Sequence, residues 1–139
     1  MSSPSNVFFK AYIFDLDVTL LDTYRCVLPN AIKEACQAMI DSGLQANLND
    51  CISVHERKTS AQLRGSFFDA VLDQFDHDKS VRESIKKSGE SAFYNRQIEE
   101  QLSLTPGSEK VLRKASQLAD LHLVTSGSEA TQLQKIEKL

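Results

Sequence analysis

An apolar run that ends in two closely spaced carboxylates constrains the fold of this chain more than any other feature. The run extends from Val7 to Phe14 with little alternation, and Asp15 and Asp17 follow it directly. Apolar runs rich in Tyr, Ile and Phe are typical of a strand buried on both faces, as in a parallel sheet. We therefore expect an α/β fold with Asp15 at the carboxyl edge of the sheet, where such folds bind ligands.

Asp15 and Asp17 have two interpretations. In the first, one carboxylate stays ionised to attack a substrate or to hold a metal ion, and the other carries a proton for a leaving group. Two like charges this close repel each other, so a buried pair needs a cation. In the second, both residues only begin a polar turn, because Asp is a common turn residue. The pair alone favours neither interpretation.

Composition and charge exclude several kinds of partner. The chain has 139 residues, with 41% hydrophobic and 25% charged residues, which is typical of one globular domain. A net charge of −3 provides no attraction to nucleic acid or to an anionic membrane. The sequence also has no apolar run long enough to span a bilayer. We therefore expect no nucleic acid and no membrane as partners.

The cysteines and the N-terminus indicate the compartment. Residues 1–6 lack the basic and apolar regions of a signal peptide. Cys26, Cys36 and Cys51 are odd in number, which favours free thiols in a reducing compartment. None has a His or a second Cys at zinc-ligand spacing. We therefore expect a cytoplasmic location and no zinc site.

Residues 24–104 predict several helices and no strand. Helical spacing of apolar residues extends from Pro29 to Gly43, and residues 48–57 predict a shorter helix. Residues 60–75 carry a broad apolar face, whose aromatic side chains we expect in the core rather than around a ligand. Residues 80–102 also have helical spacing, with a break near Asn95.

A second strand–loop–helix unit follows. Thr105 is expected to cap a helix that has Pro106 in its first turn. Residues 121–124 predict a strand, and Ser126 with Glu129 has the spacing of a capping box for a last helix whose apolar residues are Ala130, Leu133 and Ile136.

Right-handed crossovers between parallel strands would bring Asp15 and Thr125 to the same sheet edge.

These residues resemble a known family. Asp15-x-Asp17-x-Thr19-Leu20 after an apolar strand resembles the first motif of the haloacid dehalogenase-like (HAD) superfamily, and 21–23 (Leu-Asp-Thr) is similar to members with a helical cap after it. Residues 121–127 resemble the second motif, and 105–107 (Thr-Pro-Gly) the return from cap to core. The resemblance implies a Rossmannoid parallel-sheet core, here incomplete, in residues 1–23 and 105–139, with an inserted α-helical cap over 24–104.

The resemblance also implies a chemistry. Asp15 would be the nucleophile that attacks phosphorus, and Asp17 would protonate the leaving oxygen and then activate water. Thr125 would donate a hydrogen bond to the phosphoryl group, and Mg²⁺ would bind Asp15 and Asp17. The substrate would be a small phosphorylated metabolite. Further donors to the phosphate would come from the backbone around Leu16, Ser126 and Gly127.

Asp17 favours a phosphatase or a phosphomutase, because dehalogenases of the superfamily lack an acid at this position. The sequence departs from the pattern at Val18 and Ser126, where many members have Gly and Asn. It also supplies no third-motif lysine or fourth-motif acids after Thr125, since Lys135 lies on the wrong element. We therefore expect a fragment, or a chain whose sheet a partner or a further C-terminal segment completes, with weak or no turnover alone.

Two alternatives differ from the phosphatase. The first is a non-catalytic HAD-like binding module or one part of a split protein. The second is a receiver domain, which fits less well because its acids lie on separate strands and it has no helical insert. Several basic residues of the insert could contact a second anionic group of a substrate, although solvated surface charge is more typical of them. They are Arg25, Arg57, Lys58, Arg64 and Arg96.

Overall fold

The computed structural model describes residues 10–60 and 66–139 and divides the chain into two compact units. Unit 1, which we call the strand unit, contains Met1–Cys26 and Glu100–Leu139. Unit 2, the helical unit, is Val27–Glu99. The insert expected from the sequence covers residues 24–104. Each unit is described by itself below.

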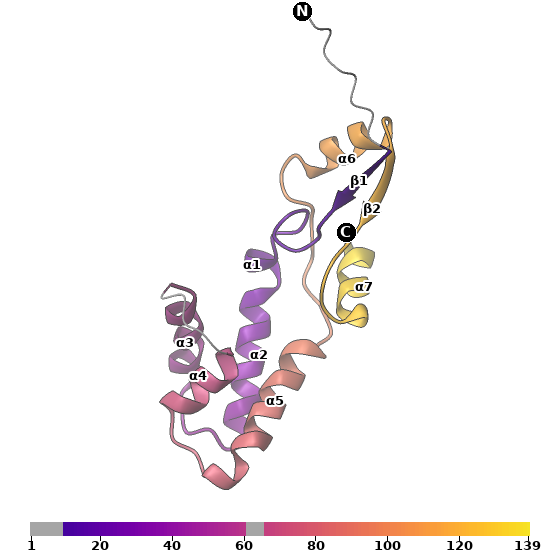
Figure 1. Ribbon diagram of the computed structural model, residues 1–139. Coiled ribbons are helices and arrows are strands. Elements are labelled where there is room, and N and C mark those ends of the chain that lie inside the picture. The colour runs from indigo at the N-terminus through magenta and orange to yellow at the C-terminus, as the bar shows by residue number, and fades with distance from the viewer. Residues whose placement is uncertain (1–9, 61–65) are drawn as a thin grey trace, which may run out of the picture. The chain divides into compact units, whose positions relative to one another are not determined.

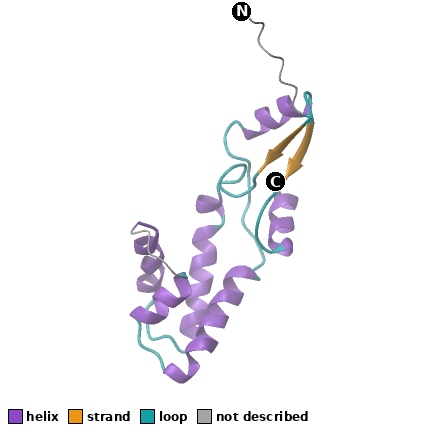
Figure 2. Ribbon diagram, viewed as in Figure 1, coloured by secondary structure: helices purple, strands orange, loops and turns teal. Residues whose placement is uncertain are grey.

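The strand unit contains two parallel strands and their helices (Figures 1 and 2). The strands pair from Ala11↔Asp120 to Phe14↔Leu123, which is the parallel α/β arrangement predicted from the sequence. In chain order, the elements are β1 (Ala11–Phe14), α1 (Thr23–Cys26), α6 (Ser108–Ser116), β2 (Asp120–Leu123) and α7 (Glu129–Lys138).

The burial predicted for the first strand is wrong for the residues that the structure describes. Side chains of β1 alternate between exposed and half-buried, and Ile13 is 70% exposed. A parallel strand is buried on both faces only where other elements cover both faces, and nothing in the described part of the strand unit covers the face of Ile13. The predicted start of this strand, residues 7–9, lies outside the described residues.

Two predicted helix caps lie elsewhere in the structure. The N-cap of α6 is Gly107, with a φ of 83°, and not Thr105, whose hydroxyl donates to the Thr19 carbonyl at 2.8 Å. The N-cap of α7 is Ser128 instead of Ser126. Ser128 has the extended backbone that a cap requires, with ψ at 135°, and its Oγ accepts from the backbone N–H of Thr131 at 3.3 Å.

The helical unit packs α2 (Leu28–Asp41), α3 (Leu48–Ser60), α4 (Phe67–Gln74), a short 3₁₀ turn η1 (Lys79–Val81) and α5 (Arg82–Tyr94) around one core. Its most extensive contact joins α2 to α5, which lie side by side in Figure 1. Phe68 is 5% exposed, so it lies in the core as predicted. The buried cluster contains Ile32, Ala35, Cys36, Met39, Leu44, Cys51, Val54, Phe68, Val71, Leu72 and Ile85.

Helix ends in this unit correct the sequence prediction in detail. The predicted helix over 60–75 begins only at Phe67, because Ser66 caps it by accepting from the backbone N–H of Asp69 at 3.1 Å. The prediction for 61–65 lies outside the described residues. The break near Asn95 is confirmed, since α5 ends at Tyr94, but 95–102 form no helix. In the parts of the chain that the structure describes, no helix is long and apolar enough to cross a membrane.

Candidate active site

The two strand ends bring Asp15 and Thr125 to one edge of the sheet. Phe14 and Leu123 are the last paired residues of β1 and β2, and the N–H of Val124 donates to the Phe14 carbonyl at 2.8 Å. Asp15 follows this bond on the first strand and Thr125 follows it on the second. Because the strands are parallel, both residues lie at the carboxyl edge, where the sequence predicted a site.

A tight loop follows β1 and carries Asp17. Leu16 is only 1% exposed, and its carbonyl accepts the N–H groups of Leu20 and Leu21, each at 3.0 Å. Val18 has a φ of 61°, a left-handed conformation that costs an L-residue about 1–2 kcal/mol. Many members of the superfamily that the sequence resembles have glycine here, and glycine adopts this conformation without that cost. The loop therefore depends on the burial of Leu16 and on these backbone bonds.

Side chains from two elements hold the Asp17 carboxylate. Lys135 Nζ donates to Oδ1 at 2.8 Å, and Gln132 Nε2 donates to Oδ2 at 3.1 Å. The Thr23 hydroxyl also donates to Oδ1. Burial raises the pKa of Asp17, but the hydrogen bonds from Lys135, Thr23 and Gln132 outweigh it and hold the pKa below its usual value. Asp17 is therefore ionised at neutral pH in this structure.

The second loop offers a buried hydroxyl. Thr125 Oγ1 is buried and has no hydrogen-bond partner among the residues that the structure describes. The Ser126 carbonyl accepts from Gln132 Nε2 at 2.5 Å. Gly127 has a φ of 123°, and a Cβ at this position would lie 2.6 Å from Gln132 Nε2. The φ of Gly127 would strain any L-residue, so glycine is favoured at this position.

Asp15 is exposed, and its Oδ1 accepts from the backbone N–H of Leu16 at 2.8 Å. Within 10–60 and 66–139, no three His, Cys, Asp or Glu side chains gather as a metal cluster. Oxygen donors at this edge nevertheless suit Mg²⁺, which binds few protein groups and keeps several waters. The Asp15 carboxylate is accessible, whereas the Asp17 carboxylate is already held by Lys135 and Gln132.

Gln132 and Lys135 are the residues that sequence reasoning missed. The sequence analysis named only the apolar residues of this helix, but Leu133 and Ile136 are 47% and 40% exposed, while Gln132 and Lys135 are buried. Two features of the sequence could have indicated them. Two close carboxylates need a cation, which Lys135 can supply, and Gln132 lies three positions before Lys135, on the same face of the helix. Lys135 lies outside the family's third motif but reaches the acid of the first.

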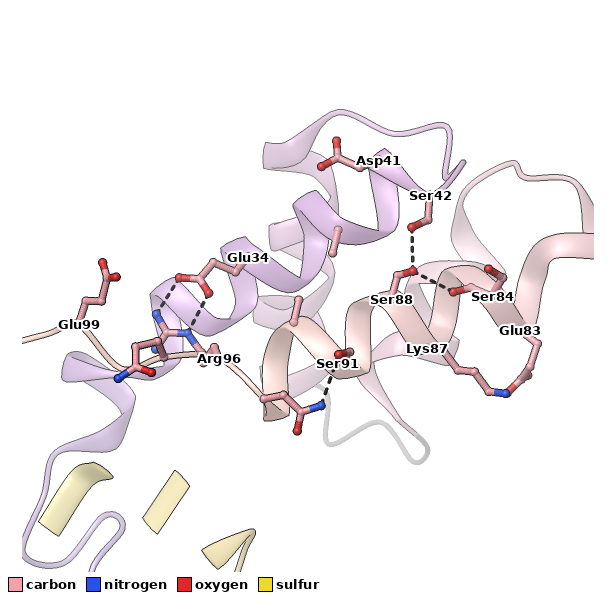
Figure 3. Close-up of a pocket in the computed structure, with 14 residues that line it drawn as sticks. Glu34, Asp41, Ser42, Glu83, Ser84, Lys87, Ser88, Ser91, Arg96 and Glu99 are labelled. Carbon is pink, nitrogen blue, oxygen red and sulfur yellow. Dashed lines mark hydrogen bonds and ion pairs between the residues drawn. The ribbon is translucent and has the colours of Figure 1, made fainter. Parts of the chain in front are cut away.

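The helical unit has an open groove of about 1110 Å³ between α2 and α5 (Figure 3). Arg96 lies in this groove, where its Nη2 and Nε donate to Glu34 at 2.7 and 3.0 Å. The groove also contains Asp41, Glu83 and Glu99. Acidic side chains therefore outnumber basic ones along its lining, which does not suit a phosphorylated ligand.

The sequence analysis named five basic residues that could contact a second anionic group of a substrate, and the structure shows the contacts of three of them. The interpretation of Arg96 as a solvated surface charge is wrong, because it is 9% exposed and paired with a carboxylate. Arg57 donates to Gln74 at 2.9 Å, and Arg25 lies 3.6 Å from Asp22. The side chain of Lys58 and all of Arg64 lie outside the described residues.

Comparison with known proteins agrees with this arrangement. The model of the family described as haloacid dehalogenase-like hydrolase matches residues 12–139, which include both strand-end loops and the helices between them. A search of curated proteins found no match. The family model covers most of the chain, and the motif residues lie at one sheet edge. The chain therefore belongs to the haloacid dehalogenase-like hydrolase family.

Proposed function

We propose that this chain is a Mg²⁺-dependent phosphatase that hydrolyses a small phosphate monoester through an aspartyl-phosphate on Asp15. One observation carries the proposal: Asp15 and the buried, unpartnered hydroxyl of Thr125 follow paired strand ends at the same sheet edge. Asp17 lies two residues beyond the nucleophile, where an acid is needed if the leaving group is an alcohol.

Each side chain has a separate role in this mechanism. An Asp15 oxygen attacks phosphorus, the ester P–O bond breaks, and the leaving alkoxide takes a proton from Asp17. Water then loses a proton to Asp17 and attacks the phosphorus of the aspartyl-phosphate, the Asp15 O–P bond breaks, and inorganic phosphate leaves. Thr125 donates to a phosphoryl oxygen, and the N–H groups around Leu16, Ser126 and Gly127 provide further donors.

The first step needs a protonated Asp17, so substrate binding has to raise its pKa. The residue is ionised in the free chain, and a phosphate dianion placed beside it favours the protonated form, because like charges repel. Mg²⁺ held by Asp15 and the Asp17 carbonyl would neutralise charge on the phosphate.

We further propose a cytoplasmic location, which the free thiols of Cys26, Cys36 and Cys51 support. The substrate would be a small phosphorylated metabolite.

A second candidate is a non-catalytic module or one part of a split protein. The observation that favours it is apolar exposure on the strands and just after them: Ile13 is 70%, Val124 60% and Leu123 40% exposed. Large apolar side chains on a sheet face are typical of a surface that another polypeptide segment covers. In this case such a segment, from a partner or from the same protein, would complete the sheet.

Hydrolysis of p-nitrophenyl phosphate with and without Mg²⁺ separates the two candidates. We expect weak Mg²⁺-dependent release of nitrophenol by the chain, no release by Asp15→Asn, and a loss of about 10²–10⁴-fold in kcat for Asp17→Asn. Asp120→Asn is the matched control, because Asp120 begins β2 at the opposite edge of the sheet. Equal turnover by wild type and Asp15→Asn, or none by either, would reject the phosphatase.

A further inference from the structure

We propose that Lys135 is a positioning residue for Asp17, so that α7 orients the carboxylate that serves as acid and base. The inference rests on the proposed function, because Asp17 has these roles only in that reaction. It adds an element to the site, since α7 follows the second motif and carries none of the motif residues.

The contacts fix both oxygens of Asp17 from one helix. Lys135 donates to Oδ1 and Gln132 donates to Oδ2, from positions three residues apart on α7. Two donors on a rigid helix determine the plane of a carboxylate as well as its position. The Thr23 hydroxyl supplies a third donor from α1.

Burial indicates that the ion pair between Lys135 and Asp17 determines which face of α7 packs inward. The side chain of Lys135 is 7% exposed, and an ammonium group this buried is unfavourable unless a carboxylate pairs with it. The helix buries Lys135 and Gln132 while Leu133 and Ile136 are half-exposed. Apolar burial alone would favour the opposite orientation. The pairing with Asp17 therefore offsets the loss of apolar contacts.

Gln132 extends the same support to the second loop. Its Nε2 donates to Asp17 and also to the Ser126 carbonyl, next to Thr125. The helix thereby ties the loop of the acid to the loop of the phosphate donor. Because Lys135 acts through Asp17 and not through the substrate, its loss should lower kcat and leave KM nearly unchanged.

The test compares Lys135→Met, Lys135→Arg and the control Lys138→Met in the full chain, with p-nitrophenyl phosphate and Mg²⁺. Lys138 is exposed on the same helix, so its variant should keep wild-type kcat. We expect kcat to fall about tenfold or more in Lys135→Met, with KM within about twofold, and Arg to restore part of the loss. In an Asp17→Asn background, Lys135→Met should have no further effect. A loss that persists in that background, or one that appears equally in KM, would overturn the inference.

A spectroscopic readout tests the contact without turnover. The side-chain ammonium of Lys135 should give a slowly exchanging ¹⁵N NMR signal that is absent in Lys135→Arg and that shifts in Asp17→Asn, while the signal of Lys138 stays unchanged. A Lys135 signal that does not respond to Asp17→Asn would overturn the inference even in a folded, active protein. If the chain hydrolyses no ester while the signal responds as expected, the proposed function fails and the pairing of Lys135 with Asp17 stands.

Discussion

The helical unit and the strand unit bury different kinds of side chain. In the helical unit, Met39, Val71 and Ile85 are fully buried among other apolar residues. In the strand unit, Ile13 is 70% exposed on its strand, whereas the charged Lys135 is 6% exposed. The helical unit therefore has an apolar cluster at its centre, whereas the strand unit exposes Ile13 on β1 and buries a charged side chain against Asp17.

The comparison also shows where the strand unit does bury apolar residues. Leu16 and Leu21, which flank Asp17 in the loop, are 1% and 0% exposed. Burial is greatest at the loop that carries the candidate acid and smallest on the strands. A loop held this way keeps its carboxylate in place while the strand faces stay accessible.

The largest expected difference between the units is in apolar truncation. Ile85→Ala should lower the free energy of unfolding by about 2–5 kcal/mol, because it leaves a cavity in a closed core. Ile13→Ala, on the exposed strand, should change it by no more than about 0.5 kcal/mol. Urea denaturation followed by circular dichroism measures both. Similar losses in the two variants would show that β1 is covered in solution.

The second expected difference between the units is in the cost of breaking an ion pair, which is buried in the helical unit and exposed in the strand unit. Glu34→Gln leaves the Arg96 guanidinium, which is 9% exposed, without its carboxylate, and should cost about 1–3 kcal/mol. Glu109→Gln is the matched control in the strand unit, because its bond to Arg113 is exposed and spans i to i+4. Such pairs contribute only about 0.3–0.5 kcal/mol. Urea denaturation measures the free energy of unfolding of both variants, and equal losses in Glu34→Gln and Glu109→Gln would contradict the burial of Arg96.

The sequence predicted those features of the fold that depend on local pattern and on strand topology. Apolar runs and their order placed Asp15 and Thr125 at one parallel edge, and helical periodicity placed Phe68 in a core. The burial of β1 was predicted wrongly, because it depends on what covers the strand and not on the strand itself. The cap of α7 was misplaced by two residues, because serines flank Gly127 on both sides and only the backbone angles distinguish them.

The contacts that hold Asp17 could not be predicted from local pattern. Gln132 and Lys135 lie 115 and 118 positions from Asp17 along the chain. Which face of α7 turns inward depends on the balance between two exposed apolar residues and one buried ion pair. Apolar periodicity takes no account of Gln132 and Lys135, so it could not indicate that they face inward.

The smallest expected effect is a difference in acid sensitivity between the two units. Burial raises the pKa of Asp17, but the bonds from Lys135, Thr23 and Gln132 leave it below the usual value. A carboxyl group with a lowered folded-state pKa contributes stability that is fully present above its ordinary pKa of about 3.9. This contribution is lost as the pH falls through the folded-state value. Asp17→Asn should therefore weaken the strand unit at neutral pH, and the difference from wild type should shrink below about pH 4.

Asp69 provides the counterpart in the helical unit. Its pKa is lowered first by the hydrogen bond from Ser66 and then by that from Lys86, so the sign of the effect is the same. Its side chain is 41% exposed, however, and solvent screens the contribution. Peptide-resolved hydrogen exchange at pH 7 and pH 3.5 should show a larger change around β1 in Asp17→Asn than around α4 in Asp69→Asn. The reverse order would mean that apolar packing, and not the contacts of Asp17, holds the strand unit together.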